Sequence, residues 1–331
     1  MKIGVIYNIA QDVFRGPALD LESDAEMKLI PQLIANELSR LGYDPVMIYA
    51  DWRLIKNCHV NRIDLALNIA EGFENFNAHE HMVASLLDYG RIRYTGADPT
   101  NILLVRDKVL TKRIVEALGV RTPAWQLVRR PVVSNLSHLT FPLILKPVRE
   151  EASIGIGYDS VVRDHDQLIR KLTILIERYE QPVLIEEYIE GREISVGVWG
   201  YESLQALPPC EFIFPEEDPL RKFRSFEYKW LGDSEEMRYP DDISTELIET
   251  MGNIAIASHQ ALNCRDYSRC DFRLTHSGKI FFLEHNFNPG IGPNSHGLSN
   301  TFTRVAEYGG YSYGEMLQRI LEIAQRRYQD A

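Results

Sequence analysis

Short apolar runs of strand length alternate with segments of helical periodicity at the start of the chain. Between about residues 24 and 41, apolar side chains recur every three or four positions, and Gly42 follows as a stop signal. Another helix is expected near 79–89. The apolar runs that we expect to be buried strands are 2–7, 45–50, 63–69 and 92–96. Strand–helix–strand order predicts a parallel sheet with right-handed crossovers, which is the α/β class.

The rest of the chain mixes helices, strands and one long irregular segment. Amphipathic helices are predicted at 101–119, 165–180, 243–262 and 314–328. Further apolar strands are predicted at 142–147, 182–189 and 192–198. Residues 213–242 are charged, rich in proline and without periodicity. Loops of this length in compact domains are commonly active-site lids, so we expect one here.

Residues 267–290 have the pattern of two strands joined by a tight two-residue turn at Ser277-Gly278. Such a turn places Asp271 opposite Glu284. Because strand side chains alternate, one face carries Arg269, Asp271, Arg273, Glu284 and Asn286. The other face, expected to lie in the core, carries Cys270, Phe272, Leu274, Phe281 and Leu283.

Two carboxylates opposed on one sheet face repel each other, so a cation between them is expected. Oxygen atoms of Asp271, Glu284 and Asn286 suit Mg²⁺, which takes one or two carboxylates and completes its shell with water and phosphates. The alternative is a solvated hairpin face whose charges are neutralised by Arg269 and Arg273. The hairpin taken alone does not decide between these two interpretations.

A lysine and a small-residue loop indicate phosphate binding in the middle of the chain. Lys146 lies within an apolar strand, where a buried lysine is costly unless it is paired. The following loop, 149–157, contains Gly155 and Gly157, and its backbone N–H groups could cradle phosphates. The alternatives are an edge-strand lysine in solvent and an ordinary hairpin turn. The two features together favour phosphate binding.

Composition excludes several classes of protein. The 331 residues are 45% hydrophobic and 25% charged, with a net charge of −11, which excludes a nucleic-acid backbone or a polybasic membrane anchor as partner. No apolar run has the length of a membrane span, and the start is too short for a signal peptide, so a cytoplasmic protein is expected. The four cysteines form no CxxC, which favours unpaired thiols. The nine histidines lack HxxxH or HExxH spacing, so a histidine-based zinc site is not indicated.

The order of these motifs resembles that of the ATP-grasp ligases. Lys146 and its loop are followed by the Glu-Glu-Tyr-Ile run at 186–189, and then by the hairpin ligands. Arg269-x-Asp271, Glu284-x-Asn286, Pro289-Gly290 and Ser295 together resemble the D-alanine–D-alanine ligase family more specifically. The resemblance extends from Arg106-Asp-Lys108 to the C-terminus and includes Tyr94-Thr-Gly96.

The resemblance implies an α/β (α+β ATP-grasp) fold. It consists of an N-terminal parallel α/β domain at 1–97, a central subdomain at 98–183 and a C-terminal subdomain at 184–331, with 213–242 as the lid. It implies ATP-dependent ligation of a small carboxylate to an amino acid or amine through an acyl phosphate. The implied cofactors are ATP and two Mg²⁺, for which Mn²⁺ could substitute. A homodimer is also implied.

The resemblance also implies roles for individual residues. Residues implied to bind nucleotide phosphates are Lys108, Lys146, Ser153 and the lid lysine Lys229. Those implied to line the adenine and ribose are Glu186, Glu187, Ile189 and Glu193. The implied metal ligands are Asp271, Glu284 and Asn286. Arg269 and the Gly290 N–H would stabilise an oxyanion, and Ser295 would bind the carboxylate of the second substrate.

The chain departs from the family pattern where the family orients its substrate. The N-terminal Gly-Gly-x-Ser-x-Glu-Arg-Glu pattern is replaced by residues 8–22, the loop serine by Ala152, the lid tyrosine by Trp230, and the first-strand His-Gly by Asn68-Ile69. The leading hypothesis is therefore the same chemistry on a different donor or acceptor. The alternatives are an authentic D-alanine–D-alanine ligase and a catalytically silent nucleotide-binding regulator, against which Arg269 argues. An oxidoreductase would need GxGxxG after the first strand, which is absent.

Overall fold

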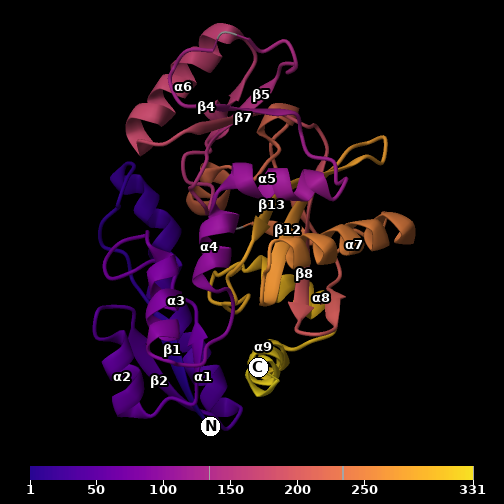
Figure 1. The fold of residues 1–331 in the computed structure, drawn as a ribbon. Coiled ribbons are helices and arrows are strands. Elements are labelled where there is room, and N and C mark those ends of the chain that lie inside the picture. The colour runs from indigo at the N-terminus through magenta and orange to yellow at the C-terminus, as the bar shows by residue number, and fades with distance from the viewer. Residues whose placement is uncertain (134, 233–234, 331) are drawn as a thin grey trace.

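The computed structural model describes residues 1–133, 135–232 and 235–330, which form three sheets and their helices. Figure 1 shows the N-terminal sheet at the lower left and the central sheet at the top. The first sheet has the order β2-β1-β3, with all strands parallel, which confirms the predicted parallel unit. Its strands are β1 (Lys2–Tyr7), β2 (Asp44–Tyr49) and β3 (Leu65–Asn68).

The helices of this unit lie at α1 (Ile30–Arg40), α2 (Leu54–Asn61) and α3 (Glu80–Tyr89). The helix expected over 24–41 is divided at Leu29 into a 3₁₀ segment, Ala18–Lys28, and α1, which begins at Ile30 and has Pro31 in its first turn, a position that proline favours. The strand expected at 92–96 is reduced to a single bridge between Ala66 and Tyr94.

The helix expected over 101–119 is two helices, α4 (Pro99–Arg106) and α5 (Lys108–Ala117). Asp107 between them has extended backbone angles, and its carboxylate accepts hydrogen bonds from the N–H groups of Val109 and Leu110. An N-cap aspartate thus ends one helix and starts the next. The break makes Lys108 the first residue of α5.

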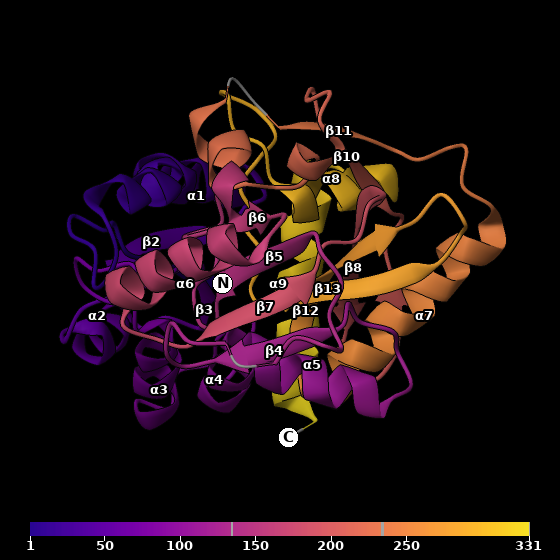
Figure 2. The ribbon, with the colours of Figure 1, turned by 90° about the horizontal axis from the view of Figure 1, so that it is seen from above.

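The central sheet has the order β4-β7-β5-β6, and α6 (His165–Tyr179) lies across it (Figure 2). Its strands are β4 (Trp125–Val128), β5 (Leu143–Pro147), β6 (Val161–Val162) and β7 (Val183–Glu187). The short strands β4 and β6 were not predicted. Because β7 pairs with β4 and β5, the predicted domain boundary at residue 183 falls at the start of a strand of this sheet.

The third sheet has the order β11-β10-β8-β12-β13, with β9 paired to β8. Its strands are β8 (Arg192–Gly200), β9 (Leu204–Ala206), β10 (Cys210–Ile213), β11 (Glu236–Arg238), β12 (Asp266–Leu274) and β13 (Ile280–Asn286). The helices near it are α7 (Thr245–Ala261), α8 (Thr301–Tyr308) and α9 (Tyr313–Gln329). The described part of the 213–242 segment contains a 3₁₀ turn at Pro219–Arg221 and a π-helical turn at Glu227–Leu231.

The predicted hairpin register is correct at the ligand end and wrong near the turn. Asp271 faces Glu284 as expected, but Phe272 faces Phe282, so Leu283 is an extra residue on β13. The cause is the loop, which has three residues rather than two and holds Gly278 at φ +77°. As a result Phe282 takes the core position expected for Phe281, and neither Phe281 nor Leu283 is in the core.

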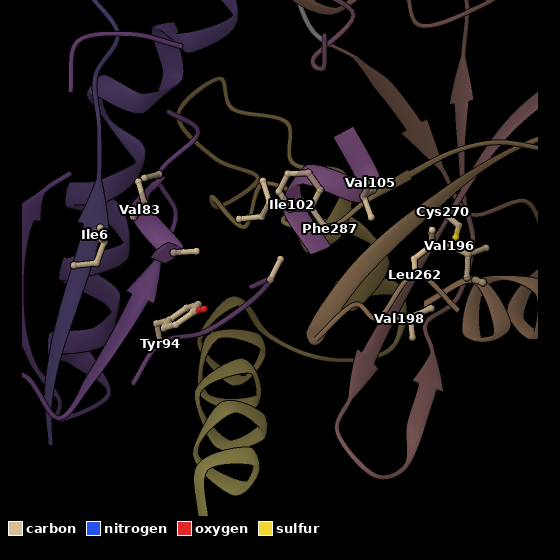
Figure 3. Close-up of a cluster of buried hydrophobic side chains, with 14 of the residues drawn as sticks. Ile6, Val83, Tyr94, Ile102, Val105, Val196, Val198, Leu262, Cys270 and Phe287 are labelled. Atoms are coloured by element: carbon tan, nitrogen blue, oxygen red, sulfur yellow. The ribbon is translucent and has the colours of Figure 1, made fainter. Parts of the chain in front are cut away.

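One buried cluster joins the N-terminal sheet to the hairpin sheet (Figure 3). It includes Ile6 and Tyr94 from the first unit, Val105 from α4, and Cys270 and Phe287 from the third. Burial of this apolar surface fixes the position of the hairpin relative to the N-terminal unit. Among the described residues, no helix is long and apolar enough to cross a bilayer.

Candidate active site

Two neighbouring cavities lie where the three sheets approach one another. The large cavity, about 350 Å³, is lined by the N-terminal unit, the 149–157 loop, the 213–242 segment and the chain after β13. The small cavity, about 80 Å³, is lined mainly by the central sheet, β12 and β13. The residues that line both, and so form the wall between them, are Glu150, Glu151, Ala152, Arg224, Lys229, Arg269 and Asn286.

On the hairpin, an arginine and an aspartate are held together at this wall. Arg269 donates through Nε to Asp271 Oδ1 at 2.9 Å and through Nη2 to Oδ2 at 2.8 Å. Ser195 Oγ also donates to Oδ1, at 2.5 Å. Burial raises the pKa of the Asp271 carboxyl, but the guanidinium groups of Arg269 and Arg224 and the hydrogen bond from Ser195 together outweigh it and lower the pKa to about 2. Asp271 is therefore ionised at neutral pH.

The other two predicted metal ligands lie beside Asp271. Glu284 faces it across the hairpin, and Asn286 donates through Nδ2 to Asp271 Oδ2 at 3.2 Å. In residues 1–133, 135–232 and 235–330, the Glu284 carboxylate has no hydrogen bond or ion pair, and it lines the small cavity. An ionised carboxylate, a second carboxylate that no described residue holds by a hydrogen bond or ion pair, and an amide oxygen fit a hard divalent cation. Their proximity is confirmed, and their role as ligands stays a prediction.

Lys108, Lys146 and Glu186 also line the small cavity, and Lys112 is paired to Glu186. Glu186 is fully buried and pairs with Lys112 at 2.5 Å and with Lys146 at 2.7 Å. Burial raises the pKa of Glu186, but the two ammonium groups outweigh it and lower the pKa to about 2. Lys108 Nζ donates to the carbonyl of Glu150. Lys146 is thus a paired lysine at a cavity, and the alternative of a solvent-exposed edge lysine is wrong.

Two hydrogen bonds join the 149–157 loop to the 213–242 segment beside the cavities. Trp230 Nε1 donates to the carbonyl of Ala152 at 2.8 Å, and Ser153 Oγ donates to the carbonyl of Arg224 at 2.7 Å. The two positions at which the chain departs from the family pattern, Ala152 and Trp230, are therefore joined by a hydrogen bond from the Trp230 side chain to the backbone of residue 152. Lys229, next to Trp230, lines both cavities. Burial and the charge of Arg224 lower the pKa of Lys229 to about 8.

The remaining predicted nucleotide residues all line the small cavity. Ile189 contributes an apolar surface, together with other apolar side chains such as Leu283. The Glu187 carboxylate accepts a hydrogen bond from the Thr140 N–H at 2.8 Å. Glu193 accepts from Arg273 Nη2 at 2.9 Å, and burial raises the pKa of Glu193. The structure therefore brings these residues together, while what they bind stays a prediction.

Of the two predicted residues after β13, one lines the large cavity and one does not. At Gly290, an added Cβ would lie 2.8 Å from Asn300 Oδ1, so a larger residue would have to displace that side chain; Gly290 itself lines the large cavity. Ser295 is exposed, bonds to His296 at 2.9 Å and is not part of the cavity lining. Ser299 lines the cavity instead. The role predicted for Ser295 has no support from its position.

Several acidic residues of the large cavity were not predicted. Glu80 is buried there and accepts a hydrogen bond from Asn288 Nδ2 at 3.1 Å. Burial, and next the charge of Glu151, raise the pKa of Glu80 well above its usual range. Glu26 and Glu71 also line the large cavity. Asn288 could have been suspected from its place in Asn-Phe-Asn-Pro-Gly, but no local signal marked Glu80.

Comparison with known proteins identifies the family. A family model described as the C-terminus of D-Ala D-Ala ligase matches residues 114–322. The D-alanine–D-alanine ligase of Aquifex aeolicus is 35% identical over 262 residues, which are 78% of this chain and 83% of the relative. The chain belongs to the D-alanine–D-alanine ligase family. It is therefore an ATP-grasp ligase, and the resemblance seen in the motifs is confirmed.

Further comparisons, one by sequence and two by structure, show how broad the likeness is. The uncharacterized protein y4sG of Sinorhizobium fredii is 34% identical over 266 residues, which are 80% of this chain and 75% of that protein. The ATP complex of the D-alanine–D-alanine ligase of Bacillus anthracis has a TM-score of 0.74 at 23% identity, covering 100% of this chain and 99% of the other. VanG D-Ala:D-Ser ligase of Enterococcus faecalis has a TM-score of 0.74 at 20% identity, with 98% and 99% covered. The ATP-grasp fold is thus confirmed.

Proposed function

We propose that this protein is an ATP- and Mg²⁺-dependent ligase that joins a small carboxylate to an amino acid or amine through an acyl phosphate. The observation that carries the proposal is the wall between the two cavities. Lys229 and Arg269 lie on it, and Asp271 and Glu284 lie beside it in the small cavity. Cations and oxygen ligands at one boundary suit a phosphoryl group that passes from a nucleotide on one side to a carboxylate on the other.

The small cavity is proposed to hold ATP. Lys108, Lys146 and Lys229 line it and supply positive charge for the phosphates, while apolar side chains such as Ile189 suit an adenine. The D-alanine–D-alanine ligase of Bacillus anthracis, which shares the fold, has been solved in complex with ATP. Asp271, Glu284 and Asn286 would hold Mg²⁺, which offsets phosphate charge as it shifts from ATP to the acceptor. We propose two ions, because the set offers two carboxylates on facing strands.

Two groups of the chain are proposed to stabilise the intermediate that forms in the second half of the reaction. The substrate carboxylate first takes the γ-phosphoryl group, and ADP leaves. The amine then attacks the acyl carbon, and a negative charge develops on the former carbonyl oxygen. Arg269, on the wall, and the Gly290 N–H, in the large cavity, are proposed to stabilise that oxygen. Collapse expels phosphate, and the amine loses a proton, which leaves an amide.

The large cavity is proposed to bind the carboxylate donor and the amine acceptor. Glu26, Glu71 and Glu80 line it, and the ammonium group of a bound substrate would supply the counter-charge that favours the ionised form of a buried acid such as Glu80. The family's loop serine and lid tyrosine are replaced by Ala152 and Trp230, which bond to each other. Because a polar site selects substrates through such groups, we propose a donor or acceptor other than D-alanine. Authentic D-alanine–D-alanine ligation is the second candidate, since the Aquifex aeolicus relative bears the name of that activity.

Phosphate release tests this function directly. Purified protein with ATP and Mg²⁺ is assayed with D- and L-amino acids, singly and in pairs, and products are weighed by mass spectrometry. Glu284→Gln is the matched inactive control. A mixed amide mass that depends on Glu284 supports the proposal, and D-alanyl-D-alanine supports the second candidate. ATP binding without phosphate release in any mixture, including mixtures with cell extract, would instead indicate a regulatory nucleotide-binding protein.

The proposed assembly is a homodimer, as the family resemblance implies. Light scattering of the purified chain tests it, and a monomer mass over the micromolar range would contradict it.

A further inference from the structure

Behind the hairpin, on the face opposite the proposed Mg²⁺ ligands, two histidines and two cysteines meet inside the protein. His259 and His285 are 2% and 4% exposed, and Cys270 is fully buried. The ligand atoms of His259, Cys264 and His285 all lie within 4.8 Å of one another. The spacing of these three residues along the chain matches none of the histidine motifs, which explains why the sequence did not indicate a site.

Backbone geometry brings the three residues together. At the C-terminal end of α7, Asn263 adopts a left-handed conformation at φ +54°, and the Cys264 N–H bonds back to the His259 carbonyl at 2.9 Å. This helix-ending turn folds Cys264 against His259. His285 comes from β13, where it faces Cys270 on β12. The cluster therefore connects α7 to both strands of the hairpin.

In each of the two imidazole rings, Nδ1 has a hydrogen-bonding partner that orients the ring. His259 Nδ1 lies 2.7 Å from Ser268 Oγ, and His285 Nδ1 lies 2.8 Å from Cys270 Sγ. With Nδ1 engaged in this way, Nε2 is the nitrogen that each ring would offer to an ion, and His285 Nε2 lies 3.3 Å from Cys264 Sγ. A metal-bound histidine commonly uses its other ring nitrogen in this way. Burial lowers the pKa of His259 to about 4, so the ring is neutral and its lone pair is available at pH 7.

The distances and the surroundings of the thiol fit a shared ion. Metal–sulfur and metal–nitrogen bonds of about 2.3 and 2.0 Å at a tetrahedral angle separate the two ligand atoms by about 3.5 Å, close to the observed 3.3 Å. Burial raises the pKa of the Cys264 thiol, and the hydrogen bond that Asn101 Nδ2 donates to Sγ at 3.4 Å acts against this shift, so it offsets part of the cost of the thiolate that an ion would bind. Asn101 Oδ1 is buried without a partner among the described residues, so the pocket also offers an unused oxygen.

We propose that His259, Cys264 and His285 form a binding site for a thiophilic transition-metal ion, Zn²⁺ or Cu(I), separate from the Mg²⁺ ligands of the active site. Thiolate and imidazole ligands select these ions over Mg²⁺. Two neutral imidazoles and one thiolate balance the charge of Cu(I), whereas Zn²⁺ would leave one positive charge and need a fourth ligand. The bound ion would tie α7 to β13, the strand that carries Glu284 and Asn286.

Metal titration of the full chain tests the site. Protein stripped with a chelator is titrated with Co²⁺, as a spectroscopic probe for Zn²⁺, and separately with Cu(I), in excess Mg²⁺ to occupy oxygen ligands. We expect one ion per chain with a sulfur-to-metal charge-transfer band. Binding of Co²⁺ and Zn²⁺ would assign the site to zinc, and binding of Cu(I) alone would assign it to copper.

Three variants and one control decide whether these residues are the ligands. Cys264→Ser should abolish the charge-transfer band, His259→Gln should lose stoichiometric binding, and Ser268→Ala should lower the affinity about 10–100-fold. Cys58→Ser, at a buried thiol in α2, should bind as the wild type does. Absence of stoichiometric binding, or an unchanged band in Cys264→Ser, would overturn the proposal. If His259→Gln does not fold, Cys264→Ser at the half-buried position decides alone.

Discussion

The pKa of Lys229 makes nucleotide affinity depend on pH in a defined direction. Burial and Arg224 lower this pKa to about 8, and the side chain lines the small cavity proposed for ATP. Nucleotide phosphates bind the charged form, so binding raises the pKa. By linkage, the affinity for the nucleotide is highest below pH 8 and falls as the pH rises through 8.

The size of the effect follows from the protonated fraction. With a pKa of about 8 in the free protein, about nine-tenths of Lys229 is charged at pH 7 and about one-tenth at pH 9. The affinity for ADP with Mg²⁺ should therefore fall about tenfold between these pH values. Proton uptake on binding should rise from about 0.1 to about 0.9 per nucleotide.

Isothermal titration calorimetry in two buffers of different ionisation enthalpy measures both quantities. Lys229→Arg is the control, because arginine stays charged over the whole range. Its affinity should change less with pH than that of the wild type, whatever its absolute value. Equal pH slopes for the two proteins would refute the assignment of this titration to Lys229.

Three further variants test the active site and its support. Glu284→Gln should lower phosphate release at least about 100-fold through loss of Mg²⁺, with an unchanged thermal melt; full turnover would contradict the metal assignment. Arg269→Ala should lower turnover about 10²–10³-fold while ADP affinity stays within a few-fold, and equal losses would mean that it only binds phosphate. Glu186→Gln should cost about 3–5 kcal/mol in urea unfolding, because Lys112 would lose a buried counter-charge. The neighbouring Glu187→Gln should cost less than about 0.5 kcal/mol, and similar losses in both would disprove the buried pairing.

The ligand face of the hairpin could be predicted because it depends on local rules. Alternation along a strand places Arg269 and Asp271 on one face, and the position of the turn brings Glu284 opposite. The length of the turn could not be predicted as reliably, because Gly278 fits both a two-residue and a three-residue loop. The predicted register is wrong only between the turn and Leu283, because this extra residue restores the expected pairing from Glu284 onward.

Features that depend on contact between distant segments were not predictable. Ala152 and Trp230 were each recognised as departures, but only the fold reveals that they bond to each other. Glu80 lies in the large cavity because the N-terminal unit packs against the chain after β13, where Asn288 meets it. The helix break at Asp107 was missed because the apolar periodicity continues through it, and a single capping aspartate outweighs that pattern.

The bulge at Leu283 has a consequence for how this protein can change. Leu283 has no facing partner of its own on β12, whereas Phe282 and Glu284 on either side of it do. Its side chain nevertheless lines the small cavity. A substitution there alters the cavity wall without altering a cross-strand pair, a core contact or a ligand. Evolution or a protein engineer could therefore reshape the pocket at this one position while the surrounding strand is preserved.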